Sequence, residues 1–306
     1  MMEIVGKTSI DFMGKRNMAF AVSGVLVFLG VVAVIGILAG WANLGIDFAG
    51  GTAVQLKFDK ALGIEEARKA LQAHGLGEAE LQEFPQDHKL LIRVKTDTTI
   101  EDEIGKQIID VFQTEFPNHG FVVDSSISIG PTIGAKLQED ALLAIVLSLA
   151  GIIAYIAVRF EFRFGLAAAI ATFHDVLAVL GIFFIMDKEI TLLVVTALLT
   201  LAGYSLTDTV IVFDRIRENL RRRRRETVSD LINNGINQVL SRTLVTTLTV
   251  VLVLVPLTIW GGEVLHDFSL ALLLGVMVGT YSSIFVASPL LLLWPGAEGK
   301  LLSRGK

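Results

Sequence analysis

The sequence contains no cysteine among its 306 residues. The chain therefore forms no disulfide, offers no thiolate to a metal and has no cysteine nucleophile. It also lacks the glycine-rich loop, followed by Lys and Ser or Thr, that holds nucleotide phosphates, so nothing indicates a nucleotide-driven motor. His74, His88 and His119 lack the spacing of metal ligands. We predict no metal, no cofactor and no enzyme active site.

Charged residues are scarce over long stretches. The chain is 53% hydrophobic with a mean hydropathy of +0.64, which is too apolar for an ordinary soluble domain and indicates a multi-pass membrane protein. Six apolar runs are each near the length of a membrane-spanning helix. The predicted spans are residues 18–41, 141–158, 164–186, 190–213, 238–259 and 268–294.

The distribution of Lys and Arg in the short loops predicts the orientation. An even number of spans puts both termini on one side, and the positive-inside rule makes the basic side cytoplasmic. The cytoplasmic parts are then the N-terminus 1–17, the basic loop 214–237 and the C-terminus 295–306, whereas the opposite short loops hold only Lys188. The run Arg221–Arg225 is typical of a contact with anionic lipid. Nucleic acid is the alternative partner for that run, but no specific nucleic-acid binding is predicted.

Residues 42–140 have the composition of a soluble domain, and the orientation puts them outside the cytoplasm, in the periplasm or its equivalent. Strand-like alternation at 52–58, 79–84, 89–95 and 121–129 is interrupted by helical spacing at 64–73 and 100–116. The order β-α-β-β-α-β predicts a small α+β ferredoxin-like domain between spans 1 and 2. No catalytic constellation is visible in it, which favours a binding or force-transmitting module.

Asp208 is the feature around which the spans are organised. It lies inside the fourth span, where a carboxylate costs about 2.5–3.5 kcal/mol and is usually turned inward and tied to ion movement. Tyr204, one turn away, is placed to bond the carboxylate. The alternative is a structural salt bridge between helices.

Three other ionisable groups fall within the predicted spans: His174 and Asp175 in the third and Arg242 in the fifth. Arg242 enters the fifth span near the end at which Asp208 leaves the fourth, so we predict that the two are partners. A nearby guanidinium favours the ionised carboxylate and burial favours the neutral one, and passage between these states can load and release a proton. Alternatively, Arg242 snorkels to the interface and His174 is a packed neutral ring. We predict Asp208 and Arg242 as a proton relay, with Asp175, His174 and Tyr204 in second rank.

Several motifs, in order over nearly the whole chain, resemble the SecF family of the SecD/SecF proteins, within the resistance-nodulation-division superfamily. The stretch around Asp47, Gly50, Gly51 and Thr52 is similar to its glycine-pair signature after the first span. The other matching motifs are VRFEFR (158–163), FHDV (173–176), GYSLTD (203–208) with DRIREN (214–219), and SRTL (241–244).

The resemblance implies an accessory subunit of the Sec protein translocase in the bacterial cytoplasmic (inner) membrane. Its partners would be SecD as a separate chain, the SecYEG channel, SecA, YajC, unfolded exported polypeptide and membrane lipid. It also implies that the carboxylate at Asp208 and the guanidinium at Arg242 link the proton motive force to export. Two other hypotheses remain: a proton-coupled exporter of small molecules from the same superfamily, and a passive scaffold whose charges only hold the spans together.

Overall fold

The computed structural model describes residues 8–60, 62–85, 87–95, 101–222 and 226–293. The chain divides into two compact units, and we describe each by itself. The helical unit comprises residues up to Asn43, Ile145–Lys188 and Leu193 onward. The sheet unit comprises Leu44–Ala144 and the short segment Glu189–Leu192. Residues 223–225 of the predicted arginine run and the predicted C-terminal segment 295–306 lie outside the described residues.

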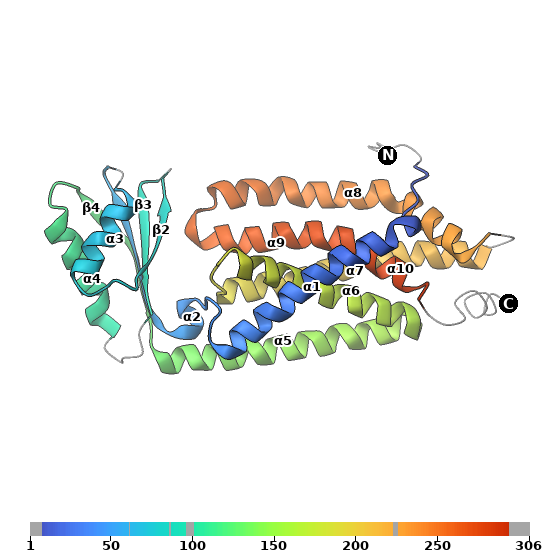
Figure 1. Ribbon diagram of the computed structural model, residues 1–306, viewed down its shortest axis with the longest axis horizontal. Helices are drawn as coiled ribbons and strands as arrows, with labels where there is room; N and C mark the ends of the chain where they lie inside the picture. Colours follow the sequence, from blue (N-terminus) through green and yellow to red (C-terminus); the bar gives the residue numbers. More distant parts are fainter. Residues whose placement is uncertain (1–7, 61, 86, 96–100, 223–225, 294–306) are drawn as a thin grey trace. The chain divides into compact units, whose positions relative to one another are not determined.

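Six helices in the described part of the chain are long and apolar enough to cross a membrane, as predicted. A 3-10 turn, Met13–Lys15, precedes the first of them. The spanning helices are α1 (Arg16–Ala39), α5 (Pro131–Arg159), α6 (Phe162–Ile185), α7 (Leu192–Arg222), α8 (Val228–Trp260) and α9 (Gly262–Ser282) (Figure 1). A π-helical turn, Ser283–Ala287, and the short α10 (Ser288–Leu290) continue α9.

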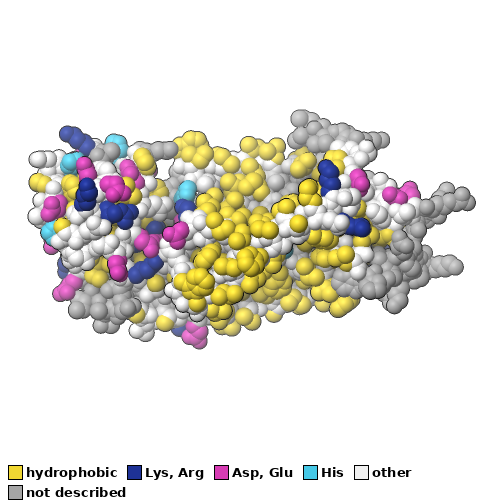
Figure 2. All heavy atoms as spheres, in the orientation of Figure 1, with side chains coloured by type: hydrophobic (Ala, Val, Ile, Leu, Met, Phe, Trp, Pro, Cys, Tyr) yellow, Lys and Arg dark blue, Asp and Glu magenta, His cyan; other side chains and the backbone are white. Residues whose placement is uncertain are grey.

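The outer faces of these helices are apolar. Leu38 on α1 is 83% exposed and Val158 on α5 is 91% exposed. Figure 2 shows hydrophobic side chains over much of the visible face of the helices, with charged side chains sparse among them. Contiguous exposed apolar surface of this extent is what a lipid environment requires.

Small residues line the contact between α1 and α6. A Cβ added at Gly30 would lie 2.2 Å from the carbonyl oxygen of Leu177, and one added at Gly181 would lie 2.6 Å from the nitrogen of Gly30. The two backbones therefore touch, which is the usual way that membrane helices associate closely. Ala167, Ala168, Ala171 and Ala178 continue this small, fully buried character along α6.

The predicted basic loop between the fourth and fifth spans is helical over most of its described length. α7 continues to Arg222, and α8 begins at Val228 with a capping box in which the Thr227 side chain accepts from the Asp230 backbone N–H. The sequence TVSD at 227–230 predicts this start. α8 then runs without a break into the fifth span, so the polar turn after Thr227 and the span are one helix.

The sheet unit has the predicted ferredoxin-like order. It contains α2 (Ile46–Ala49), β1 (Gly51–Phe58), α3 (Ile64–Ala73), β2 (Glu80–Phe84), β3 (Lys89–Val94), α4 (Glu101–Glu115) and β4 (Phe121–Ile129). The strands form one antiparallel sheet in the order β2-β3-β1-β4. Val54, Leu56 and Phe58 point from β1 to the core beneath α3 and α4, where they meet Ile108 and Phe112.

Two features of this unit are absent from the sequence prediction. The short helix α2 precedes the sheet, and the segment Glu189–Leu192 returns to it from between α6 and α7. The Gly45 N–H donates to the Ile190 carbonyl at 3.1 Å, and Leu44 and Ile190 form an isolated parallel bridge. The connection between α6 and α7 is thus hydrogen-bonded to the chain that leads into β1.

Candidate functional site

Asp208 lies in the interior of the helical unit, as predicted for an acidic residue inside a span. Its side chain is on the buried face of α7 with Ser205 and Thr209, and the residue is 4% exposed. The Thr209 and Ser283 hydroxyls form a hydrogen bond of 3.0 Å, which holds α7 to the π-helical turn beside Asp208. The Asp208 Oδ2 atom is buried, and no donor among the described residues reaches it. An ionised carboxylate only accepts hydrogen bonds, so this oxygen is an unsatisfied acceptor inside a span.

Arg242 and Asp208 make no direct ion pair in the described structure. Arg242 is exposed on α8, whereas Asp208 is buried on α7. The hydroxyl of Thr246 donates to carbonyls of its own helix, at 3.2 Å to Arg242 and 2.9 Å to Thr243. The Thr246 hydroxyl is therefore satisfied within α8.

Two further buried hydroxyls, on the helices that carry Asp208 and Arg242, have no hydrogen-bond partner in the described structure. The Tyr204 hydroxyl does not donate to Asp208, one turn along α7, and Thr243 on α8 has a buried Oγ1 without a partner. Unsatisfied buried polar atoms are rare and require a physical explanation. Here the unsatisfied atoms belong to α7 and α8, the two helices that carry the predicted relay residues.

Asp175 has the opposite character, because its carboxylate is fully satisfied. The residue is 0% exposed, and its Oδ1 lies 2.8 Å from His174 Nδ1, which donates. Its Oδ2 accepts from Ser282 of α9 at 2.7 Å and from Ser205 of α7. A Cβ added at Gly279 would lie 3.2 Å from Ser205 Cβ and 3.3 Å from its Oγ, so the glycine leaves room for the serine that donates to Asp175. One carboxylate on α6 thus ties α7 and α9 together.

His174 adds a link toward α1. Its Nε2 is buried without a partner, and its ring centroid lies 6.4 Å from that of Tyr281. The Tyr281 hydroxyl donates to the Ala19 carbonyl of α1 at 2.9 Å. Sequence reasoning named His174 and Asp175 but missed Ser205 and Ser282. The available signal was the cluster of hydroxyl residues inside otherwise apolar runs.

The glycine-pair motif forms the entry to the sheet unit. Gly50 and Gly51 have φ of +78° and +140°, and a Cβ on Gly51 would lie 2.3 Å from the Val94 carbonyl oxygen. Both positions therefore require glycine. Asp47 Oδ2 accepts from the Leu192 backbone N–H at 2.9 Å, which places a carboxylate at the start of α7. Thr52 Oγ1 bonds Ser128 Oγ at 3.0 Å between β1 and β4.

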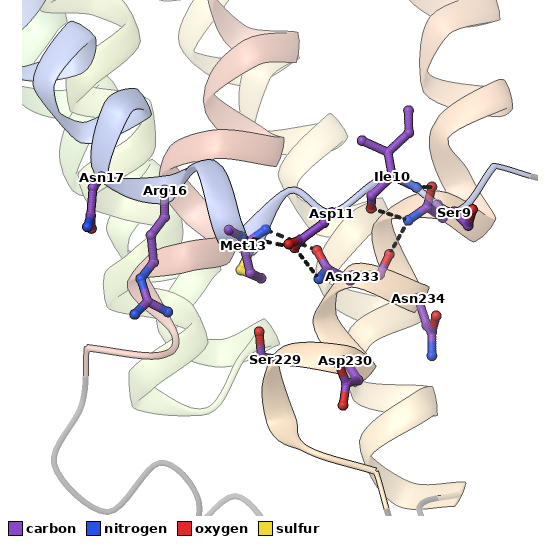
Figure 3. Close-up of a pocket in the computed structure, with 12 residues that line it drawn as sticks. Ser9, Ile10, Asp11, Met13, Arg16, Asn17, Ser229, Asp230, Asn233 and Asn234 are labelled. Atoms are coloured by element: carbon purple, nitrogen blue, oxygen red, sulfur yellow. Dashed lines mark hydrogen bonds between the residues drawn. The ribbon is translucent and has the colours of Figure 1, made fainter.

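A polar cavity of about 490 Å³ lies between the N-terminal segment and the first turns of α8. Figure 3 shows Asp11 and Ile10 bonded to asparagines of α8. Asn233 Oδ1 accepts from the Phe12 backbone N–H at 3.0 Å, and its amide donates to Asp11 at 2.8 Å. The Gly14 N–H and the Asn233 amide, both donating to Asp11, lower the pKa of that carboxyl below its usual value. This contact between the N-terminal segment and α8 was not predicted from the sequence, although Asn233 and Asn237 share a helix face.

These elements define a class: a multi-pass membrane protein with one small ferredoxin-like domain after its first span and isolated acidic groups inside its helices. The family described as "Protein export membrane protein SecD/SecF, C-terminal" matches residues 111–297, and "SecD/SecF GG Motif" matches residues 41–62. The chain belongs to the SecD/SecF family, on its SecF side.

Individual relatives agree. The chain is 51% identical over 296 residues to "Protein translocase subunit SecF" of Thermodesulfovibrio yellowstonii, covering 96% of this chain and 97% of the relative. It is 44% identical to the SecF subunit of Magnetococcus marinus over 96% of this chain and 95% of the relative. The crystal structure of SecDF from Thermus thermophilus matches with a TM-score of 0.80 and 36% identity over 94% of this chain. The chain spans 39% of the length of that SecDF chain.

Proposed function

We propose that this chain acts with SecD, present as a separate chain, to promote export of proteins across the bacterial cytoplasmic membrane with energy from the proton motive force. The relatives are translocase subunits named SecF, and the matching crystal structure is of SecDF, described as a translocon-associated membrane protein. The name of that structure joins SecD with SecF, which supports SecD as the partner. SecYEG, SecA, YajC and an unfolded client are the further partners proposed.

The observation that carries the proton-coupling part is the state of Asp208. It is an acidic residue in a span, 4% exposed, with a buried oxygen that no donor in the described structure satisfies. A proton is the smallest ligand that neutralises such a group, and a guanidinium brought beside it, as we propose for Arg242, would stabilise the ionised form. Moving one charge across 100 mV yields about 2.3 kcal/mol. Asp208 and Arg242 together can therefore alternate between a protonated state and an ion-paired state.

The absence of a direct ion pair in the structure fits one stage of such a cycle. With Arg242 exposed on α8 and Asp208 buried on α7, a shift between these helices would bring the charges together or separate them. Asp175 differs, because its oxygens accept from three side chains on α6, α7 and α9. We assign Asp175 and His174 first to positioning α7, with a direct relay role in second rank.

The proposed orientation puts both termini in the cytoplasm and the sheet unit outside. Among the described residues, Arg159, Arg163 and Arg215 lie at one set of helix ends together with Arg217, Arg221 and Arg222. The short connection from α6 to α7 holds Lys188, which pairs with Asp267 at 3.0 Å. The positive-inside rule then makes the arginine-rich ends cytoplasmic.

Export assays on membrane vesicles that contain SecD, the channel and this chain would test the proposal. Asp208→Asn and Arg242→Met are expected to abolish the part of export that depends on the proton gradient and to spare the part that persists without the gradient. Asp230→Asn is the matched control, because it removes a carboxylate from the neighbouring helix start and keeps an acceptor for the cap. Gradient-dependent export that persists in both relay variants would overturn the proposal.

An exchange of charges separates this mechanism from a passive scaffold. A structural ion pair is expected to recover when Asp208→Arg is combined with Arg242→Asp, because opposite charges again face each other. A proton relay is not expected to recover, because Asp at position 242 would lie on the exposed face of α8. Full recovery of export in the double variant would favour the scaffold.

A further inference from the structure

An ionic cluster lies in the sheet unit where the segment Glu189–Leu192 meets strands β2 and β3; its Glu189 is buried, and the Glu80 side chain is 38% exposed. The Glu189 side chain is 6% exposed and Arg93 is 15% exposed. Arg93 Nη1 donates to Glu189 Oε1 at 3.2 Å and to Gln82 Oε1 at 3.2 Å. Arg93 and Glu80 are direct cross-strand partners between β3 and β2, so Glu80 reaches the same face. None of these residues belongs to the proposed relay.

The second oxygen of Glu189 is an acceptor without a donor. Oε2 is buried, and no N–H or O–H group in the described structure bonds it. The neighbouring carboxyl is that of Glu80, which stands opposite Arg93 in the sheet while Arg93 bonds Glu189. Glu80 itself accepts from Lys95 Nζ at 2.8 Å. Two ionised carboxylates cannot bond each other, because neither carries a hydrogen. A proton on either one lets the two carboxyls bond each other and gives Glu189 Oε2 a partner.

The charges around the site support this assignment. Burial raises the pKa of Glu189 to about 8, with the Glu80 carboxyl adding to the rise and the Arg93 and Lys95 cations opposing it. A Cβ at Gly45 would lie 2.8 Å from Thr191 Cγ2, so the glycine lets the chain before β1 approach the segment Glu189–Leu192 closely. A protonated carboxyl pair braced by two cations is therefore the arrangement that these contacts favour near neutral pH.

We propose that Glu80 and Glu189 form a proton-binding site that holds the segment Glu189–Leu192 on the sheet unit when occupied and releases it when empty. The same segment is held by the Ile190 carbonyl, bonded to Gly45, and by the Leu192 N–H, bonded to Asp47. It continues directly into α7, the helix that carries Asp208. The proposed orientation places the sheet unit outside the cytoplasm, so the site would respond to the pH there. Only this choice of compartment rests on the proposed function.

Infrared difference spectroscopy on the full-length chain in lipid nanodiscs tests the site without any export assay. Subtracting the Glu189→Gln spectrum from the wild-type spectrum isolates the protonated carboxyl of this pair. The expected difference is one carboxyl band per chain, present at neutral pH and lost with a midpoint near 8. Glu83→Gln, on the opposite face of β2, is the matched control and is expected to keep the band.

Three outcomes decide the inference. Loss of the band in both Glu189→Gln and Glu80→Gln supports a shared proton, and Glu80→Gln serves alone if the first variant does not fold. A band that titrates near the ordinary glutamate pKa of 4.5, or that persists in both variants, overturns the site. The test is independent of the relay, because Asp208→Asn is expected to leave this band unchanged. If the wild-type chain lacks the band but Asp208→Asn still abolishes export, the Glu80–Glu189 site is overturned and the Asp208 relay is not.

Discussion

Raising the pH should loosen the connection between α6 and α7. The pKa of Glu189 lies at about 8 when the segment is closed on the sheet unit, against an ordinary value of 4.5. Between these values the closed form holds a proton that the open form lacks, so the closed form loses stability as pH rises through this window. Each pH unit in this window changes the free energy of opening the segment by at most about 1.4 kcal/mol. From about pH 6 to about pH 8 the opening equilibrium should grow by about 50-fold at most, or about 2 kcal/mol.

Hydrogen exchange with mass spectrometry measures this opening directly. The Leu192 amide is a suitable reporter, because its N–H donates to Asp47 and exchanges only when the segment opens. After correction for the intrinsic pH dependence of exchange, the peptide containing Leu192 should lose protection in the wild type as pH rises. Glu189→Gln should flatten that dependence, because glutamine does not titrate. An equal pH dependence in wild type and variant would refute the reasoning.

Three substitutions follow from the contacts of single residues, each measured by thermal unfolding of the purified chain. Asp175→Ala leaves three buried donors without their acceptor and should destabilise the helical unit by about 3–5 kcal/mol; an unchanged Tm would contradict its role as a link. Gly51→Ala should cost about 1–3 kcal/mol, because its φ is +140° and the new Cβ meets the Val94 carbonyl; a neutral effect would show that the strand start is not constrained. Asp47→Ala should cost about 1 kcal/mol by removing the acceptor for the Leu192 N–H, with Asp47→Asn milder, and equal losses in the two would argue against a capping role.

Periodicity explains why the fold could be predicted so fully. The alternating strands and helical spacing of the sheet unit are local signals, and each strong one became an element of the expected type. The capping box at Thr227 and Asp230 is equally local. What local pattern could not give was the return of Glu189–Leu192 to the sheet unit, because that contact joins residues about 145 positions apart, as in the bond from Leu192 to Asp47.

The candidate site shows the same division. Rarity of charge within apolar runs was enough to single out Asp208, Asp175 and Arg242. Which of them is satisfied depends on side chains from other helices, and only the structure distinguishes the bonded Asp175 from the unbonded Asp208. Glu189 escaped notice because a short polar connection between spans is an ordinary place for a glutamate. Its burial arises from tertiary packing.

Proton flux tests the central claim most directly. Proteoliposomes containing this chain and SecD, loaded with a pH-sensitive dye and given an imposed proton gradient, should acidify inside faster with the wild-type chain than with Asp208→Asn, whereas Asp208→Glu should retain part of the flux because it keeps a titratable carboxyl. If Asp208→Asn conducted protons as fast as the wild type, Asp208 would not carry them and the account would be contradicted.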